Sequence, residues 1–338
     1  MKKANIIILT IVIVLTLVAA FFTISQSNYI GGKKELRDFA IEDTSSVDKI
    51  FLVNKQNQQV LLEKTDGIWI LNKEYRARKD FVNLLLKTIH RVYVKAPVAN
   101  AAMENIIKSL ASKSTKVEIY QNGKLAKTYY VGGPTQDQHG TYMLLENSSR
   151  PFVMSIPGFR GYLSTRYTTN PYDWRTQEIF SYDYQEIAEV TIKNYENSVQ
   201  SFKAINNGNN TFELIDLSSN SKTAKFDTIE VKKFISHFTN VNFDKFLEGT
   251  DEAYVRDSLQ NAIPAFEITV KDINNEENRI FCYRRPNYRK LQADDGSFYP
   301  YDVDFLYGLI NDKTELVLIQ YYVFDPIFRE LNDFRKEE

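Results

Sequence analysis

The chain has 338 residues, a formal net charge of -1 at pH 7 and one cysteine, Cys282. One thiol excludes an intramolecular disulfide and a cysteine-based metal site, and the near-neutral charge gives no sign of the basic surface that binds nucleic acid. A hydrophobic content of 43% is typical of a folded protein, and the length suffices for about two domains.

The first two dozen residues predict a membrane anchor. Met1-Lys2-Lys3 precedes an apolar run from Ala4 to Ile24, which as a helix of about 1.5 Å rise per residue matches the hydrocarbon core of a bilayer. A cleaved signal peptide is the alternative, but bulky Phe21 and Phe22 follow the alanines where a cleavage site needs small residues. We expect a retained single-pass anchor over residues 1–24 in the cytoplasmic (inner) membrane, with the bulk of the chain in the periplasm.

A polar segment with Gly31-Gly32 and mixed charges predicts a juxtamembrane linker over residues 25–46. After it, one order of elements occurs twice: strands, two helices, strands and a short terminal helix. We therefore expect two copies of an α/β unit, over residues 47–180 and 181–338. Two separate units and one continuous sheet satisfy this order equally well.

In the first copy, Asn, Asp and Gly turns separate the expected strands Val47–Val53, Val60–Lys64, Gly67–Leu71, Lys116–Tyr120, Leu125–Val131, Thr141–Leu145 and Pro151–Ser155. Apolar spacing predicts a helix over Lys79–Tyr93 and a shorter one capped by Asn100 that buries Met103, Ile106, Ile107 and Leu110.

The second copy begins at Ile187–Lys193 and repeats the order. Asp227-Thr228-Ile229-Glu230 has the form of a capping box that opens a helix, and a shorter helix starts near Thr250. Further strands are expected at Ser201–Ile205, Thr211–Leu214, Ala265–Val270, Arg279–Arg284 and Leu316–Tyr322, with Asp325-Pro326 starting a terminal helix. The fold class is α+β, with mostly antiparallel strands covered by two helices per copy.

The loop from Gly132 to Gly140 is the strongest candidate for a site. Gly132, Gly133, Asp137 and His139 are its candidate ligand-binding residues, and Asp137 with His139 would form an acid–base pair in a hydrolase. The alternative is a turn-rich hairpin connection. Tyr283, Arg284, Arg285 and Tyr288 could grip an anion, Asp294-Asp295-Gly296-Ser297 is typical of a surface turn, and His90 and His237 fit packing or surface positions.

The chain resembles the family named domain of unknown function 4340. The resemblance rests on Asp66-Gly67-Ile68-Trp69, Tyr75-Arg76-Ala77, Val131-Gly132-Gly133, Thr141-Tyr142 and Val153-Met154-Ser155-Ile156-Pro157 through Tyr162-Leu163. Some members of that family are fused to, or encoded beside, membrane components of ABC-type transport systems, including a gliding-motility auxiliary protein of Bacteroidota. The resemblance implies an envelope location and an accessory role in transport, secretion or motility, and it transfers no catalytic residue.

No catalytic, metal or cofactor motif is recognisable in the sequence. We therefore expect a non-enzymatic, membrane-anchored envelope protein that acts as an accessory or scaffold subunit, with envelope proteins as partners and without cofactor, metal or nucleic acid. An extracytoplasmic ligand-binding module that feeds an ABC-type transporter is the alternative, with the loop 132–140 or a cleft between the copies as its site. A hydrolase that uses this loop is the remote alternative.

Overall fold

The computed structural model describes residues 14, 16, 29–30, 33–34 and 36–335. The chain divides into two compact units, Met1–Thr176 and Gln177–Glu338, each with a hydrophobic core of its own. The predicted anchor over Ala4–Ile24 lies outside the described residues except for positions 14 and 16. Within the residues that are described, no helix is long and apolar enough to cross a membrane.

A nine-stranded antiparallel sheet forms the first unit. Its strands lie in the spatial order β6 (Tyr75–Arg76), β5 (Ile68–Leu71), β4 (Gln59–Thr65), β3 (Val47–Val53), β8 (Thr115–Gln121), β9 (Lys124–Pro134), β10 (Thr141–Leu145), β11 (Phe152–Ser155) and β7 (Tyr93–Pro97). The expected hairpins are confirmed, since turn residues Asn122 and Gly123 adopt φ of 50° and 73°, the left-handed region that Asn and Gly tolerate.

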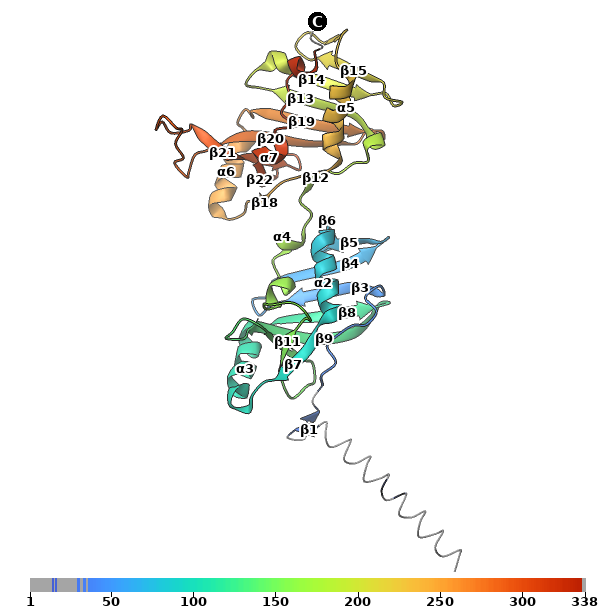
Figure 1. Cartoon of the computed structure of the whole chain (residues 1–338), viewed down its shortest axis with the longest axis vertical. Coiled ribbons are helices and arrows are strands. Elements are labelled where there is room, and N and C mark those ends of the chain that lie inside the picture. The colour runs from blue at the N-terminus through green and yellow to red at the C-terminus, as the bar shows by residue number, and fades with distance from the viewer. Residues whose placement is uncertain (1–13, 15, 17–28, 31–32, 35, 336–338) are drawn as a thin grey trace, which may run out of the picture. The chain divides into compact units, whose positions relative to one another are not determined.

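Helix α2 (Lys79–Arg91) crosses one face of this sheet (Figure 1) and buries Val82, Leu85 and Ile89. Helix α3 (Asn100–Lys113) packs against β9 and β10 through Leu110, the one residue of α3 that is fully buried. The prediction that Ile107 is buried was wrong, because this side chain is 41% exposed. The helix is also preceded by Ala99 as its cap residue, without a side-chain cap from Asn100.

The linker prediction for residues 25–46 was wrong in its second half. Phe39 and Ile41 are 2% and 4% exposed in the core of the first unit. The backbone N–H of Ile41 donates to the Ile89 carbonyl of α2, and the Lys127 ammonium donates to the Ala40 carbonyl. Residues 36–46 are therefore part of the first unit. A short pair, β1 (Tyr29–Ile30) and β2 (Lys33–Lys34), precedes them.

The unit continues after the sheet with short elements, η1 (Ser164–Tyr167) and α4 (Pro171–Trp174). Trp174 is fully buried, with its ring centroid 4.6 Å from that of Phe81 on α2. These contacts tie the end of the first unit to its long helix. The first copy was expected to continue to residue 180, but residues 177–180 belong to the second unit because β12 (Glu178–Phe180) pairs with β17 (Val241–Asn242) there.

A second nine-stranded antiparallel sheet forms the other unit. Its order is β16 (Ser221–Lys222), β15 (Phe212–Asp216), β14 (Phe202–Asn206), β13 (Ile187–Asn194), β19 (Phe266–Asp272), β20 (Glu277–Pro286), β21 (Tyr301–Ile310), β22 (Glu315–Gln320) and β18 (Lys245–Phe246). Short 3-10 turns η2 (Tyr184–Glu186), η3 (Ser198–Gln200), η4 (His237–Thr239) and η5 (Leu331–Phe334) connect or follow these strands. The two units thus contain two separate sheets rather than one continuous sheet, and their strand orders correspond position by position.

Helix α5 (Thr228–Ser236) lies across the second sheet (Figure 1) and buries Val231, Phe234 and Ile235. The Asp227 half of the predicted capping box is confirmed, because its carboxylate accepts hydrogen bonds from the backbone N–H groups of residues 229 and 230. The reciprocal bond to Glu230 is not formed, since the Asp227 N–H donates to the Phe334 carbonyl. Helix α6 (Thr250–Gln260) contacts β21 and β22. The buried cysteine is confirmed as well, since Cys282 is 0% exposed.

The predicted terminal helix from Asp325-Pro326 was wrong. The helix in this region is α7 (Tyr321–Phe324), and Asp325 is the residue that ends it. The structure thus shows a mixed α+β fold of mostly antiparallel strands with few helices.

Candidate functional site: an exposed aromatic arm

The connection between β20 and β21 forms an arm, defined as residues 286–301, that projects beyond the neighbouring strands (Figure 1). Its two sides are held together by a bridge between Gln292 and Phe298 and by a hydrogen bond from the Tyr299 N–H to the Leu291 carbonyl (3.1 Å). Gly296, with φ of 81°, closes the turn at its end. The arm is therefore an ordered hairpin extension, and the surface turn expected at Asp294-Asp295-Gly296-Ser297 is confirmed.

Large aromatic side chains of the arm face solvent. Tyr288 is 59% exposed, Phe298 61%, Tyr299 39% and Tyr301 48%. Single exposed apolar side chains are common on proteins, but several exposed aromatics on one short projection are typical of a binding surface. Tyr and Phe are also enriched in protein–protein interfaces, where their large rigid rings fill pockets of a partner.

A cluster of ion pairs holds the base of the arm, and we call it the ionic brace. It consists of Asp302 and Asp304 with Arg285 and Arg289. The Asp302 side chain is 0% exposed and accepts hydrogen bonds from Arg285 and, at 2.7 Å, from Arg289. Arg289 also reaches Asp304 at 2.6 Å. Burial acts to raise the pKa of Asp302, but hydrogen bonds from the backbone N–H groups of Asp304 and Phe305 and from Arg289 outweigh it and hold the pKa below its ordinary value.

The contacts of Arg284 and Arg285 bear on the hypothesis that these two residues bind an anion. Arg285 stacks over Tyr288, with 5.1 Å from guanidinium carbon to ring centroid, and is neutralised by Asp302. Arg284 pairs with Glu196 at 2.6 Å. Both cations thus have carboxylate partners within the chain, and they stabilise the base of the arm.

The predicted site residues lie elsewhere, at the β9–β10 hairpin of the first unit. Gly132 and Gly133 are in β9, and Asp137 and His139 lie in the connecting loop. The Asp137 carboxylate accepts from the Thr135 hydroxyl and from the His139 backbone N–H (3.1 Å), and these bonds lower its pKa. The imidazole Nδ1 of His139 contacts the backbone carbonyl of Asp137 rather than its carboxylate. This arrangement is a locally bonded turn, not the geometry of an acid–base pair.

The two glycines in this hairpin have different environments, which gives a paired test. A Cβ atom at Gly132 would lie 2.6 Å from Leu110 Cδ2 and 3.1 Å from the Tyr142 carbonyl oxygen, whereas a Cβ at Gly133 meets nothing within 4 Å. We expect Gly132→Ala to lower the free energy of unfolding by roughly 1–3 kcal/mol, because it forces α3 away from the sheet. Gly133→Ala is the control and should change it by less than about 0.5 kcal/mol. Urea denaturation of both variants measures the difference, and equal values would contradict a packing role for Gly132.

Sequence reasoning did not connect the residues of the arm. The aromatic run Phe298-Tyr299-Pro300-Tyr301 is a visible signal, since proline and glycine nearby place these aromatics in a turn region rather than in a strand interior. Among the residues that the structure describes, no group of three or more His, Cys, Asp or Glu side chains is arranged to hold a metal ion.

Comparison with known families identifies a matching family model. The model described as Domain of unknown function (DUF4340) matches residues 69–258, which is more than half of the chain. The match begins in β5 of the first unit and ends in α6 of the second, so it spans the division between the units, and the arm lies outside it. Comparison with curated proteins and with solved structures finds no significant match.

Proposed function

This chain belongs to the family named domain of unknown function 4340, and we propose that it is a non-enzymatic accessory or scaffold subunit, tethered to the membrane, that binds an envelope protein through its aromatic arm. The observation that carries the proposal is the exposure of Tyr288, Phe298 and Tyr299 on a hairpin braced by Asp302. A braced arm presents its aromatics in one conformation, so binding loses less conformational entropy.

The charge of the arm favours a protein over a lipid surface as its partner. Residues 286–301 include two basic residues, Arg289 and Lys290, and two acidic residues, Asp294 and Asp295, so their formal charges cancel. Attraction to anionic headgroups needs an excess of cations, which the arm does not have. An interface with a protein instead needs a few large anchors surrounded by polar groups. The aromatics of the arm with their mixed charges match that description.

The tether and the location are proposed from the sequence. The apolar run from Ala4 to Ile24 after Lys2-Lys3 supports a single-pass anchor in the cytoplasmic membrane, and we place both units in the periplasm. Protease treatment of spheroplasts checks this orientation. Degradation of the units from outside is the expected result, and protection until the cells are lysed would contradict it.

We also infer that the two units descend from one duplicated unit. The support is the correspondence of their strand orders, including the edge strands β7 and β18, which in both units come from the segment between the two helices. Experimental structures in which the two units superimpose strand for strand would support a duplication. A different connectivity in either unit would contradict it.

Co-purification tests the proposed binding. The full chain, with an affinity tag at its C-terminus, is extracted from its native membranes in a mild detergent after brief cross-linking, and captured proteins are identified by mass spectrometry. We expect at least one envelope protein to be captured by the wild type and to fall at least tenfold in the variant Tyr288→Ser, Phe298→Ser, Tyr299→Ser, since anchor residues of an interface cost on the order of 2 kcal/mol each.

The matched control replaces three exposed apolar residues of the first unit, Ile68→Ser, Ile107→Ser and Leu125→Ser, which are 45%, 41% and 52% exposed. This variant should capture the same protein as the wild type. Equal losses in both variants would indicate nonspecific adhesion. Capture that persists without the arm aromatics, or association of the arm with protein-free vesicles, would overturn the proposal.

A further inference from the structure

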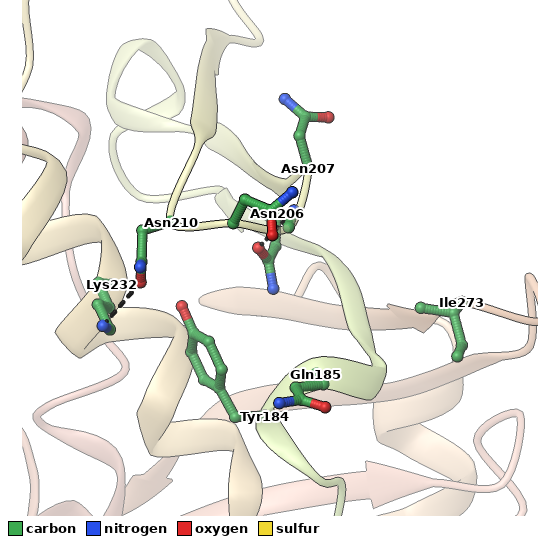
Figure 2. A pocket seen from close by; sticks show the side chains of 9 residues that line it. Tyr184, Gln185, Asn206, Asn207, Asn210, Lys232 and Ile273 are labelled. Atoms are coloured by element: carbon green, nitrogen blue, oxygen red, sulfur yellow. Dashed lines mark hydrogen bonds between the residues drawn. The ribbon is translucent and has the colours of Figure 1, made fainter.

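Arg166 in η1 and Lys232 in α5 differ in whether the protein itself engages their charge. Lys232 borders a pocket of the second unit, but Figure 2 shows its ammonium donating to the Asn210 side chain at 2.8 Å, so this cation is held within the chain. Arg166 makes one such bond, from Nη1 to the Thr88 hydroxyl at 2.9 Å. Its Nε and Nη2 atoms have no hydrogen-bond partner among the residues that the structure describes, and they are not shielded from solvent.

The guanidinium of Arg166 is held in one orientation by its neighbours. It lies over the Phe159 ring, with 4.3 Å from guanidinium carbon to ring centroid. Thr88, which binds its Nη1, donates in turn to the Leu84 carbonyl at 2.7 Å. The Phe159 ring packs against the core of the first unit and lies so close to Gly161 that a Cβ there would be 3.0 Å from it. Stacking covers a face of the guanidinium and leaves the donors in its plane free.

The free side of Arg166 is the one that binds oxyanions elsewhere in this chain. Arg284 donates from Nε and Nη2 to the two carboxylate oxygens of Glu196, at 2.9 Å and 2.6 Å. The same two atoms of Arg166 have no such acceptor within the described residues. Arg166 therefore presents a preorganised pair of donors with the geometry for a bidentate bond to an oxyanion.

Two further arginines belong to the same region. Arg91, in the last turn of α2, donates to the Pro157 carbonyl at 3.3 Å, and Arg160 directly follows Phe159 in the chain. In the part of the chain that the structure describes, neither of them has a carboxylate partner, and nor does Arg166. The negative end of the helix dipole explains a cation such as Arg91, but not the other two. We call Arg91, Arg160 and Arg166 the arginine cluster.

The chemistry of the arginine cluster fits a phosphate group. Burial disfavours the charge of Arg166 and lowers its pKa, and a bound anion would offset this unfavourable contribution. A carboxylate has two oxygens and a single charge, which one bidentate arginine already engages. A phosphate group offers up to three free oxygens and up to two charges, so it can accept from more than one guanidinium at once.

From these features we propose that the arginine cluster binds a phosphate group, with Nε and Nη2 of Arg166 as its main donors. The site goes beyond the proposed function, and it lies in the first unit, so it depends neither on the arm nor on the arm's partner. A soluble phosphate ester and a lipid head group are two sources of this group. The lipid is within reach because eleven residues, 25–35, separate the apolar run from this unit and span at most about 40 Å.

The test uses the full chain in micelles of a maltoside, which has neither charge nor phosphate. Binding is measured by calorimetry with inorganic phosphate and with glycerol 3-phosphate, and by native mass spectrometry after phosphatidylglycerol is added to the micelles. Binding of the soluble probes alone supports a phosphate ester as the source, and retention of phosphatidylglycerol that they do not displace supports a lipid. The proposal is overturned if none of the three binds at millimolar concentration, or if a hexaglutamate peptide binds and phosphate does not displace it.

Variants at Arg166 distinguish a binding role from a structural one. Arg166→Gln should weaken phosphate binding at least tenfold, because a bidentate charge-assisted bond is lost. Arg166→Lys keeps the charge without the paired donors and should weaken binding about threefold or more. The matched control is Arg78→Gln, since Arg78 also lies over a ring, that of Phe81 at 5.8 Å, but is paired with Asp80 at 2.7 Å. This variant should bind phosphate like the wild type.

Melting temperatures provide the second readout. Phosphate should raise the melting temperature of the wild type by mass action, and Arg166→Gln should abolish this increase. Without phosphate, the melting temperature of Arg166→Gln should stay within about 3 °C of the wild-type value, because the lost guanidinium has no ion-pair partner. A larger decrease together with unchanged phosphate affinity would show that Arg166 is only structural and would overturn the proposal.

Discussion

Phe234→Ala is expected to lower the free energy of unfolding of the second unit by about 4 kcal/mol while the first unit keeps its stability. Phe234 is 2% exposed, and its ring centroid lies 5.3 Å from those of Phe202 and Phe238 and 5.4 Å from that of Phe334. The substitution leaves a cavity and also removes two edge-to-face ring contacts, with Phe238 and Phe334, and one tilted contact with Phe202, which contribute beyond the buried area.

The chain carries separate reporters for the two units. Both of its tryptophans, Trp69 and Trp174, lie in the first unit, whereas its one cysteine, Cys282, is buried in the second. Burial raises the pKa of the Cys282 thiol, so it reacts with thiol reagents only after unfolding. In a urea titration, Phe234→Ala should shift the midpoint of thiol reaction to lower urea and leave the midpoint of tryptophan fluorescence in place.

Ile229→Ala is the matched control for this experiment. Ile229 lies on the same helix, α5, but is 63% exposed, so its replacement should change the stability by less than about 0.5 kcal/mol. If Phe234→Ala shifted both reporters by the same amount, the two cores would unfold as one cooperative unit. That result would contradict their description as separate cores.

The second large effect is expected at the base of the arm. Asp302→Asn should lower by about 3 kcal/mol the free energy needed for the arm to open away from its ion-paired base. Removing one member of a buried ion pair costs roughly 3–5 kcal/mol. The cost should lie at the lower end of this range because the Arg289 side chain is 43% exposed, so that water can solvate its charge once Asp302 is replaced. The asparagine N–H₂ group would also face Arg285, which is itself a donor.

Hydrogen exchange over residues 286–302 and trypsin cleavage after Arg289 or Lys290 measure this opening. Both should become faster in Asp302→Asn, and capture of the arm's protein partner should weaken because its aromatics lose their fixed direction. Asp294→Asn, an exposed position at the end of the arm, is the control and should leave exchange at the base unchanged. Unchanged exchange in Asp302→Asn would show that the brace does not hold the arm.

The depressed pKa of Asp302 also predicts a pH dependence. A carboxyl group whose pKa is lower in the folded state stabilises that state above its ordinary pKa of 3.8, and this contribution is lost as the pH falls further through the folded-state pKa. The protection of the arm's amides, relative to their intrinsic exchange rate at each pH, should therefore stay constant from neutral pH down to about pH 4 and fall at lower pH. In Asp302→Asn this acid-induced opening should be absent.

The predicted hairpins show how much local sequence decides. Asn122-Gly123 and Asp66-Gly67 adopt the left-handed backbone that their small or short polar side chains permit, and strands pair on either side of each turn. The Asp227 cap is equally local, because its carboxylate bonds to N–H groups two and three residues later. These elements need no distant partner, which is why their positions could be predicted.

Elements that depend on distant partners were missed or misplaced. Strand β7 was not predicted, and its first residue, Tyr93, was assigned to the end of a helix that ends at Arg91. Tyr93 and Val94 instead pair with Ser155 and Met154 of β11, about sixty positions away. The prediction of a linker failed for a similar reason: Phe39 and Ile41 are apolar residues in a polar segment, and only the surface formed by α2 and β9 makes their burial favourable.

Sequence by itself therefore determined the hairpins, the Asp227 cap, the repeated order of elements and the family, because each depends on neighbouring residues or on their order along the chain. Tertiary structure decided which aromatics are core and which are surface. Phe234 and Phe298 are the same residue type, but one is 2% and the other 61% exposed, because α5 lies over a sheet while the arm extends past its neighbours. Burial depends on what the rest of the chain places against a side chain. For the aromatics of the arm, only the fold decides whether anything is placed there.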